Sequence, residues 1–183
     1  MSTRNLVLSL FPLALSLAFG SAVVGSAAFA ETPGLGKNIS ESDIKAWNID
    51  VLPDGTNMPP GSGTPAQGAA VYAQKCAACH GENGTNPRPG YPPMIGIKKF
   101  DKIDAPKTIT YYEFASTLFD VIRRSMPYQM PKTLTDNEVY ALSAYILSLN
   151  KIIGENDVMN AETLPKVKMP NAGKFTIPYP DRI

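Results

Sequence analysis

The sequence is poor in the residues that most often bind metals or form disulfides. Its 183 residues include one histidine and two cysteines. A structural zinc site normally takes four Cys or His ligands, so three such residues argue against one. Charge of one sign is not in excess either, with 17 Lys and Arg against 16 Asp and Glu. This balance argues against nucleic acid as a partner.

An apolar segment opens the chain, with Arg4 as the only charged residue before Glu31. The segment ends in Ala28-Phe29-Ala30, which has the small residues of a cleavage site. This layout predicts a secretory signal peptide that is cleaved after residue 30, and therefore a periplasmic protein. An uncleaved anchor is the alternative, since about 20 apolar residues span a bilayer. Glycines and serines dilute the segment, which favours cleavage.

Both cysteines and the histidine lie in one run, Cys76-Ala77-Ala78-Cys79-His80. The spacing C-x-x-C-H is typical of c-type haem attachment, in which both thiols bond to the porphyrin. The adjacent imidazole then ligates the iron. A plain disulfide is one alternative. A thioredoxin-like redox pair is another, but the chain lacks the strand and helix alternation that it would need. One motif predicts one covalent haem c.

A second histidine ligand from this chain is excluded, so methionine is the expected sixth ligand of the iron. Position along the chain favours Met126 and Met130, each followed by a proline that fixes the backbone after a helix. Core filling is the alternative role for either residue. The Gly- and Pro-rich loop after the motif offers a carbonyl for the other imidazole N–H, and Pro92 is the candidate. The simpler interpretation is that these prolines only stiffen the loop.

Start signals and helical periodicity predict three helices, at 64–75, 110–124 and 135–149. Pro65 behind Thr64 marks the first start. Capping boxes are predicted at Thr110 with Glu113 and at Thr135 with Glu138. The apolar stripe of the third helix needs a partner, and Gly68 on the first helix would permit a close approach.

The chain resembles class I cytochrome c. The resemblance consists of Gly68-x-x-x-Tyr72 before the C-x-x-C-H run, the Pro92-x-Met94-x-Gly96 loop, a Met-Pro pair and the last helix. A longer resemblance connects it to the cytochrome subunit of Sox-type sulfur dehydrogenase and to sulfite dehydrogenase cytochromes. That resemblance covers nearly the whole mature chain, in six stretches: Trp47–Val51, Pro53–Gly55, Pro59–Gly63, Lys107–Pro127, Leu134–Leu147 and Leu164–Asn171.

The resemblance implies an all-α, class I cytochrome c fold with extended N- and C-terminal arms. It implies Met126 as the axial methionine, with Met130 as the alternative. Its implied domains are a signal peptide (1–30), an N-terminal extension (31–63), a haem domain (64–153) and a C-terminal tail (154–183).

The same resemblance implies a carrier of single electrons and not an enzyme. Its partner would be a molybdenum-containing sulfite or sulfur dehydrogenase subunit, with a cytochrome or oxidase downstream. A general soluble shuttle between respiratory complexes is the alternative function.

The arms carry apolar side chains that we expect to clasp the haem domain or a partner: Trp47, Phe175, Ile177 and Tyr179. Arg123 and Arg124 are expected either to pair with a haem propionate or a partner, or to lie in solvent at a helix C-terminus.

Overall fold

The computed structural model describes residues 36–96 and 108–175. The chain divides into two compact units, Met1–Asn38 and Ile39–Ile183, and the second contains every described helix and strand. The helices are α1 (Glu41–Trp47), α2 (Pro65–Lys75), α3 (Ala77–His80), α4 (Ala115–Ser125) and α5 (Asp136–Leu149). Two short strands, β1 (Ser62–Gly63) and β2 (Met159–Asn160), pair antiparallel. Three single 3₁₀ turns complete the set: η1 (Glu82–Gly84), η2 (Ile109–Tyr111) and η3 (Leu164–Lys166).

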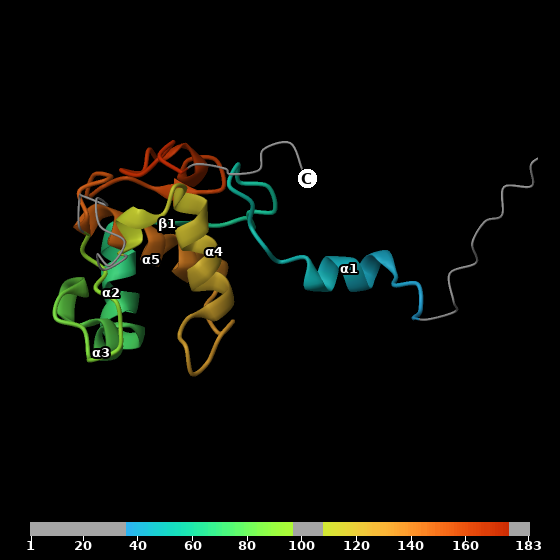
Figure 1. Ribbon diagram of the computed structural model, residues 1–183, viewed down its shortest axis with the longest axis horizontal. Helices are drawn as coiled ribbons and strands as arrows, with labels where there is room; N and C mark the ends of the chain where they lie inside the picture. Colours follow the sequence, from blue (N-terminus) through green and yellow to red (C-terminus); the bar gives the residue numbers. More distant parts are fainter. Residues whose placement is uncertain (1–35, 97–107, 176–183) are drawn as a thin grey trace, which may run out of the picture. The chain divides into compact units, whose positions relative to one another are not determined.

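Helix α5 is the centre of the fold. It packs against both α2 and α4, and Figure 1 shows it between them. Nine of its residues are buried, which explains why its apolar stripe needed partners on two sides. With strands of only two residues each, the predicted all-α class is confirmed.

Helices α2 and α5 begin where the sequence predicts. Thr64 caps α2 by accepting a hydrogen bond from the backbone N–H of Gln67, and Pro65 occupies the first turn. Thr135 and Glu138 form the predicted capping box at the start of α5. Each box satisfies backbone N–H groups that the helix itself leaves without partners.

Helix α4 starts five residues later than predicted, at Ala115. The expected capping box is wrong: Thr110 is buried in η2, where its hydroxyl hydrogen-bonds to that of Thr108 over 2.8 Å. Glu113 instead accepts a hydrogen bond from the backbone N–H of Gly173, in the C-terminal arm. Phe114 is the N-cap of α4 and provides no side-chain hydrogen bond. A contact 60 residues away along the chain therefore displaces a plausible local signal.

Helix α2 crosses α5 at close range because Gly68 has no side chain. A Cβ on this residue would overlap the backbone carbonyl of Ala141 in α5. Beside the crossing, the rings of Tyr72 and Tyr145 lie 5.3 Å apart. The crossing fixes the direction of α2, and α2 ends directly at the Cys76 motif.

The two arms differ in their contacts. Helix α1, in the N-terminal arm, has a capping box of Ser40 and Asp43 but no buried residue. This helix was not predicted, although Ser-x-x-Asp is visible in the sequence. Trp47 at its end is 83% exposed. The chain becomes buried at Val51, whose backbone N–H donates to Asp120 of α4 over 3.0 Å.

The C-terminal arm lies on the helical core. Lys168 forms an antiparallel bridge with Phe114, and the Asn171 side chain donates to the backbone carbonyl of Tyr111 over 2.8 Å. The ring of Phe175 lies at right angles to that of Tyr111. Ile177 and Tyr179 lie outside the described residues, as does the predicted signal peptide. Among the described helices, none is long and apolar enough to cross a bilayer.

Candidate haem site

A cavity of about 470 Å³ opens at the end of the helical core. Its volume lies in the range of pockets that bind drug-sized ligands and cofactors. Figure 1 shows α3 on one side of this end and the loop after α4 on the other. The lining residues are Tyr72, Lys75, Cys76, Cys79, His80, Gly90, Tyr91, Pro92, Met94, Ile122, Met126, Pro127, Tyr128, Gln129, Leu134, Leu142 and Ile146.

The predicted attachment motif forms one wall of the cavity. Cys76 ends α2, and the following turn of helix α3 carries Cys79 and His80. The backbone N–H of His80 donates to the Cys76 carbonyl over 3.0 Å, so the histidine is held one turn beyond the first cysteine. Both cysteines are free thiols, and His80 is buried. Two thiols and one imidazole therefore face the same cavity.

Pro92 lies beside the imidazole. Its carbonyl oxygen is 3.4 Å from Nδ1 of His80, which leaves Nε2 as the nitrogen available to a metal. The loop that carries Pro92 is tied back to the motif, because Arg88 N–H donates to the Cys79 carbonyl over 3.0 Å. Such a carbonyl partner fixes the tautomer of a ligating histidine and contributes to its orientation.

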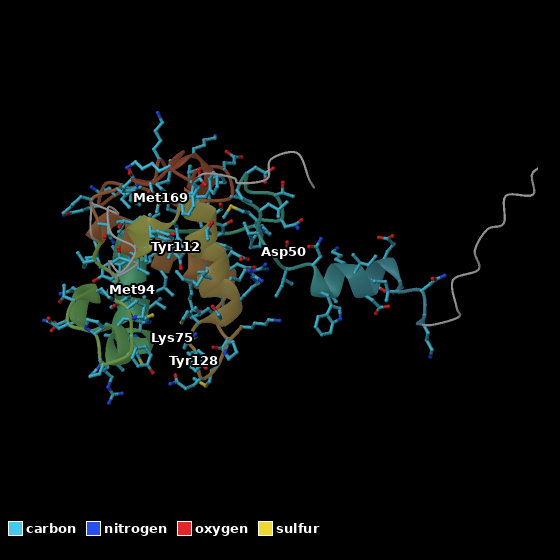
Figure 2. All side chains as sticks on the ribbon, in the orientation of Figure 1. Asp50, Lys75, Met94, Tyr112, Tyr128 and Met169 are labelled. Atoms are coloured by element: carbon cyan, nitrogen blue, oxygen red, sulfur yellow. The ribbon has the colours of Figure 1, made fainter. Side chains whose placement is uncertain are left out.

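The methionines differ in whether they line the cavity. Met126 ends α4 and lines the cavity from the side of that helix. Met130 lies on the surface, 62% exposed, and does not line the cavity. Met94 also lines the cavity, from the loop that follows the haem motif (Figure 2). Met159 and Met169 are buried in the core, outside the cavity lining.

The cavity is mostly apolar. Its one lining lysine, Lys75, is paired with Glu138 at 2.7 Å, and this lysine is the largest cause of the lowered pKa of Glu138. Burial raises the pKa of the Cys76 thiol to about 11, so the group is neutral at physiological pH. Burial also raises the pKa of Tyr72. Two thiols that can bond to a porphyrin, one imidazole that can ligate its iron and apolar walls fit a haem.

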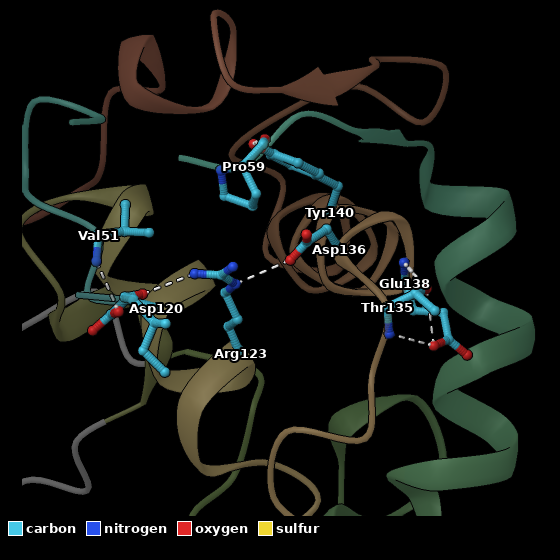
Figure 3. A network of polar contacts seen from close by, with 9 residues as sticks. Val51, Pro59, Asp120, Arg123, Thr135, Asp136, Glu138 and Tyr140 are labelled. Atoms are coloured by element: carbon cyan, nitrogen blue, oxygen red, sulfur yellow. Dashed lines mark hydrogen bonds and ion pairs between the residues drawn. The ribbon is translucent and has the colours of Figure 1, made fainter. Parts of the chain in front are cut away.

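The two arginines of α4 do not line the cavity. Figure 3 shows Arg123 between two elements: its Nε donates to Asp136 over 3.0 Å, and a second nitrogen donates to the Ile49 carbonyl over 2.8 Å. Arg124 pairs with Asp120 on its own helix. Both side chains are engaged within the chain, at the C-terminal end of α4.

Sequence reasoning missed several cavity residues. Tyr91 packs against His80, with ring centroids 5.8 Å apart and ring planes at 81°. Tyr128 and Leu134 come from the loop between α4 and α5. Tyr91, Tyr128 and Leu134 belong to no periodic apolar pattern, so the sequence did not indicate that they line the cavity. Across the described residues, no cluster of three or more His, Cys, Asp or Glu side chains offers a separate metal site.

The similarity of the chain to known proteins agrees with a haem site at this cavity. The cytochrome c family model matches residues 65–150. The solved structure of the sulfane dehydrogenase SoxCD from Paracoccus pantotrophus matches with a TM-score of 0.71 and 36% identity, covering 82% of this chain and 73% of that one.

Two curated proteins match more locally. Thiosulfate dehydrogenase of Stutzerimonas stutzeri is 30% identical over 95 residues, which is 50% of this chain and 29% of that protein. The cbb3-type oxidase subunit CcoP of Cereibacter sphaeroides is 40% identical over 53 residues, 27% of this chain and 18% of that protein. The chain thus spans less than a third of the length of either. Its helical fold, its C-x-x-C-H motif at the cavity and its likeness to the SoxCD structure place the chain in the cytochrome c family, as a class I cytochrome that resembles the Sox cytochrome subunit.

Proposed function

We propose that the chain is a periplasmic monohaem cytochrome that accepts single electrons from a molybdenum-containing sulfite or sulfur dehydrogenase. The observation that carries the proposal is the likeness to the SoxCD structure over 82% of the chain, well beyond the haem motif alone. Thiosulfate dehydrogenase, the curated relative that matches half of the chain, is also a sulfur-oxidising enzyme by name. The proposed leader, residues 1–30, would deliver the chain to the periplasm.

Within this proposal, Cys76 and Cys79 would bond the haem covalently and His80 would ligate its iron. Met126 would be the second ligand, since it lines the cavity from a different element and Met130 does not. The Pro92 carbonyl would help to orient His80. A haem bound here supplies an iron that cycles between the ferric and ferrous states. The remaining role of the protein is to exclude water and hold both ligands in place.

We propose the same domain boundaries as those expected from the sequence. A haem domain of residues 64–153 contains α2 to α5, with an N-terminal extension (31–63) and a C-terminal tail (154–183) on either side. Electrons leave the haem for a downstream cytochrome or oxidase. With His80 and Met126 both holding the iron, the chain would act as an electron carrier and would need no substrate site of its own.

The test adds sulfite, or separately thiosulfate, to the oxidised holoprotein with and without a periplasmic extract of the native organism. The visible spectrum of the haem reports reduction. Rapid reduction that requires both the sulfur compound and the extract is the expected result. Reduction by the extract without any sulfur compound would instead favour a general shuttle, for which the local match to an oxidase subunit is the supporting observation.

A further inference from the structure

The imidazole of His80 has two neighbours that restrain it, and the Pro92 carbonyl is only one of them. The separation of 3.4 Å between that oxygen and Nδ1 is longer than the 2.7–3.2 Å of an ordinary N–H···O hydrogen bond. A contact this long fixes the tautomer but resists rotation of the ring weakly. A second restraint is therefore needed to set the plane of the imidazole.

Tyr91 is placed to provide that restraint. Its ring plane is nearly perpendicular to that of His80, at 81°, with 5.8 Å between the centroids. Aromatic rings prefer such edge-to-face contacts, and their geometry depends on the mutual angle of the rings. Rotation of the imidazole would disturb this contact even where it left the hydrogen bond intact.

The backbone around Tyr91 is well fixed. The Tyr91 N–H donates to the Arg88 carbonyl over 3.1 Å, and the Arg88 N–H donates to the Cys79 carbonyl, one residue before His80. Gly90, with a φ of +89°, provides the left-handed turn that precedes the tyrosine. Histidine and tyrosine are thus carried by segments that hydrogen-bond to each other.

We propose that Tyr91 is a positioning residue that sets the plane of the His80 imidazole through its ring. The inference rests on the proposed function, because the angle of the imidazole matters only where His80 ligates the haem iron. The contact is made between the two rings, so we expect phenylalanine to fulfil the same role. The plane of an axial imidazole sets how its π orbitals overlap with those of the iron, and hence the magnetic anisotropy of ferric haem.

The experiment compares three variants of the ferric holoprotein by proton NMR of the haem methyl groups and by EPR. Tyr91→Leu removes the ring and Tyr91→Phe keeps it. Phe175→Leu is the matched control, because Phe175 makes a similar contact with Tyr111 at 79°, away from the cavity. We expect changed methyl shifts and g values in Tyr91→Leu alone, whereas the other two variants match the wild type.

A wild-type methyl pattern in Tyr91→Leu would overturn the inference, and so would equal changes in Tyr91→Phe and Tyr91→Leu. Should Tyr91→Leu fail to retain haem, Tyr91→Trp replaces it: this larger ring must shift the pattern away from that of Tyr91→Phe, and an unshifted pattern refutes the role. Failure of the haem site looks different, since the wild-type protein would then lack a low-spin haem with an imidazole ligand. Failure of the sulfur dehydrogenase as electron donor would leave these spectra unchanged and would appear only in the reduction assay.

Discussion

Met126 and Met130 are four residues apart and both precede a proline, yet only Met126 lines the cavity. We expect Met126→Ala to lose the weak far-red absorption that a methionine sulfur gives ferric haem, and to bind carbon monoxide in the ferrous state at neutral pH. Met130→Ala should keep the absorption and bind no carbon monoxide, because Met130 is 62% exposed. Visible spectra of the two holoproteins, recorded with and without carbon monoxide, show which methionine ligates the iron. The reverse pattern would make Met130 the ligand.

The sequence predicts the residues of the motif well and the rest of the cavity poorly. Cys76, Cys79 and His80 lie within five consecutive residues, so their spacing alone predicts that their side chains are close together. Tyr91 meets His80 only because a tight turn brings it back to α3. The contribution of Tyr128 depends in the same way on the path of a loop. Loop geometry follows from contacts that no periodic pattern encodes.

At the scale of helices, the capping box of α5 allows a paired test. Thr135 accepts from the backbone N–H of Glu138, and removing such a cap costs about 1 kcal/mol. Thr135→Ala should therefore lower the free energy of unfolding by roughly that amount. Ser40→Ala removes the equivalent cap of α1, which has no buried residue, and should leave the haem domain unchanged. Denaturant unfolding of the holoproteins, followed by haem absorbance, measures both.

The crossing of α2 and α5 leaves no room for a side chain at Gly68. Because alanine favours the helical conformation more than glycine does, Gly68→Ala by itself would stabilise α2 by about 1 kcal/mol. The added methyl group meets the backbone of Ala141, which cannot rotate aside as a side chain would. We expect a net loss of about 2 kcal/mol in unfolding free energy, as for other overpacked cores.

Gly154→Ala is the control for this crossing. Its Cβ would lie 3.4 Å from the nearest atom, an oxygen of Asp157, which is ordinary contact distance. The change should stay within about 0.5 kcal/mol. Equal effects at the two glycines would contradict the close crossing. Denaturant unfolding of the Gly68→Ala and Gly154→Ala proteins, with their m-values compared, measures the two changes in unfolding free energy.

Helix boundaries were predicted correctly where the start signal is local, and wrongly where it is not. Thr64 and Thr135 cap their helices with residues three positions away. Thr110 and Glu113 have the same spacing, but Glu113 accepts from Gly173 and Thr110 is buried in a turn. Tertiary contacts there outweigh the local preference. Helical spacing of the apolar residues predicts a buried stripe of Phe114, Leu118, Val121 and Ile122, of which Leu118 and Ile122 are buried. Phe114 is instead 38% exposed, and the fully buried Phe119 lies outside the predicted stripe.

At the scale of the whole molecule, the two arms contribute differently to stability. Asn171 is buried, and its side chain donates to the Tyr111 carbonyl. Asn171→Ala should destabilise the holoprotein by about 1 kcal/mol, the usual contribution of one internal hydrogen bond. Trp47→Ala should change stability by less than about 0.5 kcal/mol, because the indole is 83% exposed. Thermal unfolding of both variants tests this, and a larger loss for Trp47→Ala would show that α1 packs on the domain.

Asn150, at the C-terminal end of α5, binds the loop that follows the haem motif and carries Met94. Its side chain accepts from the Gly96 N–H over 2.7 Å and donates to the Met94 carbonyl over 3.0 Å. Met94 N–H in turn donates to Gly84, just beyond the haem motif. Electron transfer is fast when the surrounding nuclei hardly move as the charge changes. A loop held at these points has little freedom to rearrange, which would lower the reorganisation energy of a haem bound in this cavity, so that a smaller difference in potential would be needed to drive the electron.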